Sequence, residues 1–201
     1  STLILGNFVN IILIASRFVS GADGSNSITY FMYSVVILNT LLTSVVGNIS
    51  TITLRNFSIK KDTRMMVISL IISILVGVLM IITFNFLGYK IINVIYVRGA
   101  FTTFDAVQTS DYLYKLSYGF VCLFVATALF QPFLSLSINE TKKERFYFVI
   151  VLLLTIIISS LVVLFMSMSA INRTVIVMTI SSLVSVLLAA YSYNKYLNYE
   201  N

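Results

Sequence analysis

The sequence contains no histidine and no tryptophan, and it has only one cysteine and one proline. Without histidine, the chain lacks the residue for His-based catalysis and for most zinc and haem sites. The single cysteine, Cys122, excludes an internal disulfide, and its apolar surroundings in the sequence favour a packing role. A cluster of Asp, Glu and His, which a membrane enzyme would need, is also missing. We therefore expect no enzyme activity, no metal and no cofactor.

Charged residues are also scarce, at 10% of the chain, whereas 59% of the residues are hydrophobic and the mean hydropathy is +1.00. Soluble domains carry about 25% charged residues, so this chain has too few to cover a surface that faces water. The apolar residues come in blocks long enough to cross a bilayer as helices. Runs such as Phe148–Met166 lack the alternation of a barrel strand. The sequence predicts an all-α, polytopic membrane helix bundle.

The apolar blocks predict six membrane-spanning helices in a single bundle over residues 1–201: Leu3–Phe18, Ile28–Leu54, Met65–Leu87, Val107–Ile138, Phe146–Met168 and Thr174–Tyr193. The first block has no charged leader or cleavage site, so we interpret it as a span and not as a signal peptide. Because the chain begins at Ser1 and turns apolar at once, we expect a fragment of a longer protein. Pro132 is expected to bend or shorten the fourth helix.

The net charge of +6 comes from basic residues placed between the apolar blocks, which indicates membrane topology and not a nucleic-acid partner. One side of the predicted membrane carries the larger group: Arg55, Lys60, Lys61, Arg64, Lys142, Lys143, Arg145 and Lys195. The other side carries Arg17, Lys90, Arg98, Lys115 and Arg173. Since basic loops stay in the cytoplasm, we expect the larger group and both ends of the chain there.

The segment Tyr89–Ala106 is too apolar for a free loop and too short to span again. We expect it to lie along the outer membrane face or to pack against helix ends. Arg98-Gly99 should break it, because glycine tolerates the left-handed conformation. Thr102, three residues before Asp105, is the pattern of a capping pair that opens the next helix.

Ile91–Asp105, with the sequence IINVIYVRGAFTTFD, resembles the segment before the tenth helix of MurJ/MviN-type lipid II flippases. In that family an apolar stretch leads to a basic G-x-F-T turn, an acidic residue and a long helix. The following helix, Tyr112–Ser137, continues the similarity with Leu-Ser-Tyr-Gly119 and Pro-Phe-Leu-Ser135. Asn139-Glu-Thr-Lys142 stands where the family often has D-T-K-T-P, and Ser27–Leu54 is similar in layout to the eighth helix.

This resemblance implies helices seven to twelve of about fourteen, which form one lobe of a two-lobe transporter in the multidrug/oligosaccharidyl-lipid/polysaccharide exporter superfamily. It also implies a lipid-linked sugar substrate used in peptidoglycan or polysaccharide synthesis, a bacterial cytoplasmic (inner) membrane, and a missing N-terminal helix lobe of the same chain as partner. One position departs from the pattern. Val35 and Val36 stand where lipid II flippases often carry an Asp-Arg pair, so lipid II itself is not assigned.

A carrier for a polar head group needs a polar cleft and a cation to offset the diphosphate. The second span offers Asn39, Thr43 and Gly47 on one helical face, extended by Ser50, and Asn48 is a further cavity candidate. Small polar residues also mediate helix packing, which is the structural alternative. Arg17 is the best cationic candidate, although an arginine at a helix end can simply reach for lipid head groups.

Asp111 and Lys115 lie one helical turn apart near the start of the fourth span. An ionisable pair inside a membrane can couple transport, whereas an i, i+4 pair can also be a local stabiliser. We expect alternating-access translocation of a polyprenyl-diphosphate-linked sugar. The alternatives are a cation-coupled drug or small-molecule antiporter of the same superfamily, and a membrane scaffold without transport activity.

Overall fold

The computed structural model describes residues 6–22, 26–60, 63–135 and 138–199, and within these ranges it is helical and has no strand. The elements are α2 (Phe8–Gly21), α3 (Ser27–Leu41), the π-helix η1 (Leu42–Gly47), α4 (Asn48–Lys60), α5 (Thr63–Tyr96), α6 (Thr103–Ser135), α7 (Ile138–Leu164) and α8 (Ala170–Tyr199). Five helices are long and apolar enough to cross a membrane, with α3, η1 and α4 forming one of them, and α2 is a shorter apolar helix. The predicted all-α polytopic bundle is confirmed.

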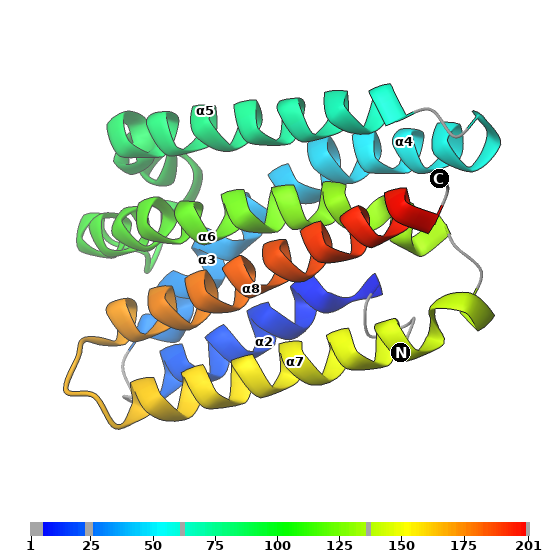
Figure 1. Ribbon diagram of the computed structural model, residues 1–201. Helices are drawn as coiled ribbons and strands as arrows, with labels where there is room; N and C mark the ends of the chain where they lie inside the picture. The colour runs from blue at the N-terminus through cyan, green and yellow to red at the C-terminus, as the bar shows by residue number, and fades with distance from the viewer. Residues whose placement is uncertain (1–5, 23–25, 61–62, 136–137, 200–201) are drawn as a thin grey trace.

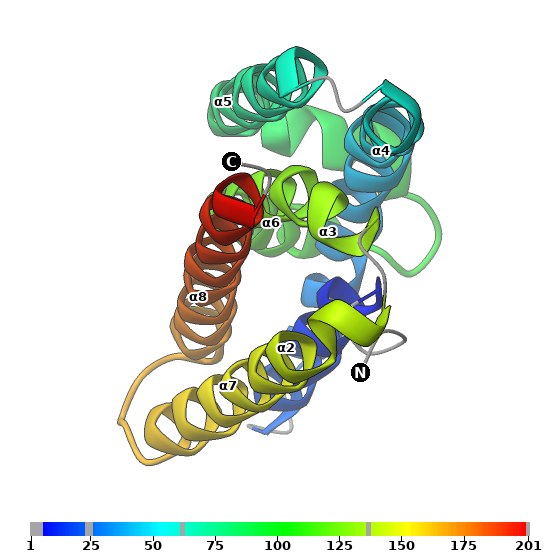
Figure 2. The same cartoon turned by 45° about the vertical axis from the view of Figure 1, so that its right-hand side comes forward.

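Helix α6 is the centre of the bundle. It packs most extensively against α5 and α8, and it also contacts α3, η1 and α4. Figure 1 shows α5 and α4 on one side of α6, with α8, α2 and α7 on the other. Figure 2 shows that α2 and α7 form the edge of the bundle farthest from α5. The buried faces of α6 explain why its sequence is not strongly amphipathic: several helices surround it.

The register of α5 against α6 is set by two glycines. A Cβ atom built on Gly77 would lie 2.9 Å from Cγ2 of Val121, so only glycine allows this close approach without a shift of its neighbour. One built on Gly88 would lie 3.9 Å from Cβ of Ser110. From Gly77 to Gly88 the residue numbers rise along α5, whereas their partners in α6 fall from Val121 to Ser110. Helix α5 is therefore antiparallel to α6.

Helix α2 begins and α8 ends at the same end of the bundle, as Figure 1 shows. The junction between α4 and α5 lies at that end, and the α2–α3 and α7–α8 connections lie at the other. This arrangement agrees with an even number of antiparallel passes. The basic residues Arg55 and Arg64 flank the α4–α5 junction, whereas Arg17 and Arg98 lie near the opposite end.

The apolar segment after Tyr89 is not a separate surface element, because α5 continues through it to Tyr96. The last turns of α5 turn away from the axis of the rest of the helix, as Figure 2 shows. The ring of Tyr33 in α3 then lies beside two aromatic rings, with its centroid 4.6 Å from that of Tyr96 and 5.2 Å from that of Phe101. The expectation that the segment packs against helix ends is confirmed for these aromatic residues.

The turn after α5 follows the sequence prediction closely. α5 ends at Tyr96, and Gly99, with a φ of +61°, takes the left-handed conformation in the turn that follows. Asp105 then accepts hydrogen bonds from the Thr102 backbone N–H at 2.8 Å and from the Thr102 hydroxyl at 2.7 Å. The Asp105 backbone N–H returns a bond to the Thr102 hydroxyl at 3.3 Å. The capping pair at the start of α6 is therefore formed.

The predicted connections were too long in three places. Arg55–Arg64 and Asn139–Arg145 are mostly helical, since α4 runs to Lys60, α5 starts at Thr63 and α7 starts at Ile138. Likewise, α8 begins at Ala170, within the predicted turn Met168–Arg173. Lys, Arg and Glu are good helix formers, so a helix continues past the apolar block into the charged region. Pro132 does not end α6, which continues for three more residues to Ser135.

Candidate functional site: a polar stripe on an intramembrane helix

The continuous helix α3–η1–α4 presents polar side chains on its outer face. We use the name polar stripe for five exposed residues: Thr40, Thr43, Ser44, Asn48 and Thr51. They follow one another at helical spacing on the side that no other described helix covers. Arg55 is also exposed and continues the stripe towards the α4–α5 junction.

The outer faces of α5 and α7 have a different chemistry. The exposed large side chains of α5 are almost all aliphatic or aromatic: Val67, Ile68, Ile71, Ile74, Leu75, Val78, Leu79, Ile82, Phe86, Leu87, Tyr89, Val94 and Ile95. Those of α7 are Phe146, Tyr147, Val151, Leu154, Ile157, Ile158, Leu161 and Val162. These two faces match the hydrocarbon core of a bilayer, whereas the polar stripe does not.

The polar stripe lies at the middle of the apolar belt. Gly77 is midway along the exposed apolar residues of α5 between Val67 and Leu87, and it packs against Val121 of α6. Two hydrogen bonds join α3 to α6, from Tyr30 to Asp105 and from Ser34 to Thr109. Both link residues 75 positions apart, so the two helices are parallel. Extending this register brings η1 alongside Val121, and η1 contacts both α5 and α6.

Each hydroxyl or amide donor of the stripe bonds to a carbonyl of its own helix. Thr40 donates to Val36 O at 2.7 Å, Thr43 to Asn39 O at 2.9 Å and Ser44 to Thr40 O. Asn48 Nδ2 donates to Ser44 O at 2.7 Å, and Thr51 donates to Gly47 O at 2.9 Å. Each hydroxyl hydrogen is used within the helix, whereas the oxygens of these exposed side chains keep their acceptor lone pairs, so the stripe offers hydrogen-bond acceptors to a molecule beside it.

The six-residue π-helix η1 lies within this stripe. In a π-helix the hydrogen bonds run from i to i+5, and such turns are rare and frequent at functional sites. The buried residues keep a spacing of four through the turn, as Leu38, Leu42, Val46 and Ser50. An α-helix has 3.6 residues per turn, so it could not keep all four on one side. The wider turn allows it.

The sequence-predicted cavity residues do not all share one face. Thr43 and Asn48 are exposed, whereas Asn39 and Gly47 are half-buried. Ser50 was expected to extend this face, but it is completely buried, with 0% of its surface exposed. The prediction was wrong for Ser50 because it assumed a straight α-helix, and the π turn rotates the residues that follow it.

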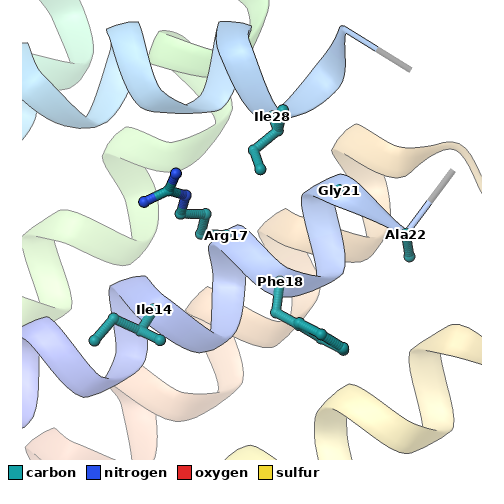
Figure 3. Close-up of a pocket in the computed structure, with 6 residues that line it drawn as sticks. All are labelled: Ile14, Arg17, Phe18, Gly21, Ala22 and Ile28. Carbon is teal, nitrogen blue, oxygen red and sulfur yellow. The ribbon is translucent and has the colours of Figure 1, made fainter. Parts of the chain in front are cut away.

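Arg17 lies apart from the polar stripe, in an open groove between α2 and the start of α3. The groove has a volume of about 380 Å³ and is lined by Ile14, Arg17, Phe18, Gly21, Ala22 and Ile28. Figure 3 shows the guanidinium reaching from α2 towards the helix that carries Ile28. Arg17 is exposed and has no hydrogen bond or ion pair with another residue in the described ranges. Its guanidinium is open to an anion, in otherwise apolar surroundings.

Asp111 and Lys115 form the predicted ion pair, with 2.9 Å between Asp111 Oδ2 and Lys115 Nζ. Both side chains are partly exposed. The hydroxyls of Tyr114 and Tyr118 hydrogen-bond to each other on the same helix. The i, i+4 geometry of the pair is that of a local helix stabiliser.

Several contacts were not predicted from the sequence. Tyr30 donates to Asp105 Oδ1 at 2.8 Å, and the buried Ser34 hydroxyl donates to Thr109 O at 2.9 Å. Both join segments far apart in the chain, so local patterns carry no signal for them. Arg145 was assigned only a topological role, yet only 1% of its surface is exposed. Charge at a helix end does not reveal whether the helix end is covered by its neighbours.

Within the described residues, no group of three or more His, Cys, Asp or Glu side chains could hold a metal ion. The polar groups that the stripe exposes are hydroxyls and the carboxamide of Asn48. Comparisons with family models, with curated proteins and with solved structures found no match for this chain.

Proposed function

We propose that this chain forms one wall of a membrane carrier that moves a polyprenyl-diphosphate-linked sugar across the bacterial cytoplasmic membrane by alternating access. The observation that carries the proposal is the polar stripe on α3–η1–α4. It is exposed at the depth of Gly77, where the exposed side chains of α5 are apolar. A face of this kind is stable in a membrane when water, a polar ligand or other protein covers it.

A sugar head group suits the stripe better than a metal ion or a drug cation. Sugars offer many hydroxyl donors, and the side-chain oxygens of the exposed Thr43, Ser44 and Asn48 are acceptors. No carboxylate lies in the stripe, so a cation would find no opposite charge there. The diphosphate requires a cation instead, and Arg17 is an open guanidinium on the neighbouring helix.

The antiporter alternative requires a carboxylate free to bind and release its coupling ion. Asp111, the intramembrane carboxylate that the sequence offered for this role, is held by Lys115 at 2.9 Å. The scaffold alternative requires a partner protein on the polar stripe in place of water. A scaffold would bury the stripe permanently, so the two proposals differ in the access that water has to Asn48.

The proposal is tested by depleting the full-length protein in its host and measuring how much lipid-linked sugar appears at the outer leaflet. Depletion should lower this amount, and the unaltered protein should restore it. A chain with Thr43→Leu and Asn48→Leu should restore it several-fold less. The matched control is Thr155→Leu on α7, whose hydroxyl also donates to its own helix, to Val151 O at 2.8 Å. Unchanged exposure after depletion would reject the proposal.

A further inference from the structure

Two alternative faces of the second span could be buried, and they differ only in the part of the span that follows the π-helix η1. In the sequence, apolar residues recur in alternating steps of four and three along the whole span: Phe31, Val35, Leu38, Leu42, Val45, Ile49 and Ile52. This is the pattern of a straight α-helix that buries one continuous apolar face. A straight helix would therefore bury Val45, Ile49 and Ile52.

The structure follows this pattern only as far as Leu42. Beyond that residue, the buried positions are Val46, Ser50 and Thr53. Ile52, which the straight pattern would bury, is 57% exposed. The change of face is what one extra residue in a helix produces, because each residue advances an α-helix by about 100°. η1 accommodates that extra residue.

The observed register leaves two mismatches. The Ser50 hydroxyl is buried and has no hydrogen-bond partner among the described residues, whereas an exposed position could satisfy it. Ile52 is an aliphatic side chain in line with the polar stripe. A straight helix would correct both at once, since it would carry Ser50 outwards and Ile52 inwards. Two registers with opposite costs are the requirement for a bistable element.

We propose that η1 is a register switch, in which the π turn converts to a straight α-helix and rotates α4 about its own axis relative to α3. The inference rests on the proposed function, because the rotation changes the residues that face the carrier's cavity. With the π turn, the mid-membrane wall contains Asn48 and Thr51. In the straight form, Gly47 and Ser50 join the wall and Asn48 moves to its edge.

This switch gives the wall a different set of hydrogen-bonding groups in each state. The carboxamide of Asn48 is the largest polar group of the stripe. When rotation of α4 moves it away from the cavity, the affinity for a head group falls. A carrier needs such a change between binding and release, and a ligand shifts the equilibrium only through contacts that differ between the two states. Asn48 supplies a contact of this kind.

The test measures labelling by a water-soluble maleimide in native membranes, with the full-length chain carrying Cys122→Ser and a single new cysteine. Asn48→Cys, Thr51→Cys and Ser50→Cys chains are compared. Asn48→Cys and Thr51→Cys should label readily. Ser50→Cys should label at roughly 0.1–10% of their rate, the share expected for a minor state within a few kcal/mol of the major one.

Two further changes hold the helix in one register. Deletion of Val45 removes the extra residue, so the observed faces fit a straight helix and Ser50→Cys should label at least about tenfold more slowly than in the undeleted chain. Ile52→Asn makes burial of position 52 unfavourable, so it should also slow the labelling of Ser50→Cys. This substitution provides the test if the chain with the Val45 deletion does not fold. An unchanged thermal unfolding midpoint establishes that each chain is folded.

The outcomes separate the two proposals. If Asn48→Cys and Thr51→Cys do not label, the stripe is not water-lined and the proposed function fails. If these two label while Ser50→Cys shows no labelling above background, the register switch alone is overturned. Labelling of Ser50→Cys that neither the Val45 deletion nor Ile52→Asn reduces also overturns the switch.

Discussion

Asp105 joins three segments through one carboxylate. Its Oδ2 atom accepts two bonds from Thr102 in the turn before α6, and its Oδ1 atom accepts one from Tyr30 in α3. The capping bonds were predictable, because the spacing Thr-x-x-Asp has a local meaning. The Tyr30 bond was not, because its partner lies 75 residues away and depends on how α3 packs on α6.

Replacement of Asp105 by alanine should destabilise the start of α6. The change removes the helix cap and the bond that ties α3 to it, so we expect the unfolding midpoint in detergent to fall by roughly 2–4 °C or more. Asp111→Ala is the control, because it removes a partly exposed i, i+4 pair and should move the midpoint far less. Equal effects of the two changes would contradict the assigned role of Asp105.

Two buried serines on the second span should respond in opposite ways to alanine. The Ser34 hydroxyl donates to Thr109 O and Tyr30 O, both at 2.9 Å, so Ser34→Ala should cost about 1 kcal/mol. The Ser50 hydroxyl has no partner in the described part of the chain, so Ser50→Ala should be neutral or stabilise by up to about 1 kcal/mol. Chemical unfolding of the two variants provides the comparison, and a loss at Ser50 equal to that at Ser34 would refute it.

At the scale of the helix, the sequence predicted the spans well and their internal geometry less well. Composition and apolar length determine that a segment is a membrane helix, which is why α3, α5, α6, α7 and α8 were all expected. The π turn was not expected, because the apolar pattern from Phe31 to Ile52 fits a straight helix. Which of two possible faces is buried depends on α5 and α6, and their packing is a tertiary property.

The close contact of α5 with α6 at Gly77 gives a prediction at this scale. Gly77→Ala would place a Cβ atom 2.9 Å from Val121 Cγ2 and should cost about 1–3 kcal/mol, because both helices must move apart. Adding Val121→Ala should recover part of the loss by removing the opposing methyl groups. Gly47→Ala is the control, since its nearest contact would be an ordinary 3.5 Å to Leu42 O. Unfolding midpoints of the four chains test this.

For the whole molecule, the decisive feature is that different faces have different chemistry. Between Val67 and Leu87 the exposed side chains of α5 are apolar except for Asn85, whereas the α3–η1–α4 face exposes Thr43, Ser44 and Asn48 at the depth of the α5 belt. The sequence indicated polar density in the second span, and of the residues it proposed for a cavity there, Thr43 and Asn48 are exposed and Asn39 is half-buried. It could not show that Arg17 lies in a groove between α2 and the start of α3, since that depends on the helix arrangement.

The two faces should tolerate a lysine very differently. Leu79 is 62% exposed on α5, and Leu79→Lys would place a charge in lipid at a cost of about 3 kcal/mol. Asn48→Lys should cost much less, because a water-lined wall can solvate the ammonium group. The amount of folded protein in the membrane and its unfolding midpoint report both effects. Similar losses for both lysines would show that the polar stripe faces lipid.

The central claim is that the polar stripe meets water in the middle of the membrane. Its most direct test is spin-label accessibility in lipid bilayers, with Asn48→Cys on α4 and Leu79→Cys on α5 compared in a Cys122→Ser chain. The label at position 48 should collide readily with a water-soluble nickel chelate and little with oxygen, and the label at position 79 should show the reverse. High oxygen and low nickel accessibility at both positions would contradict the account.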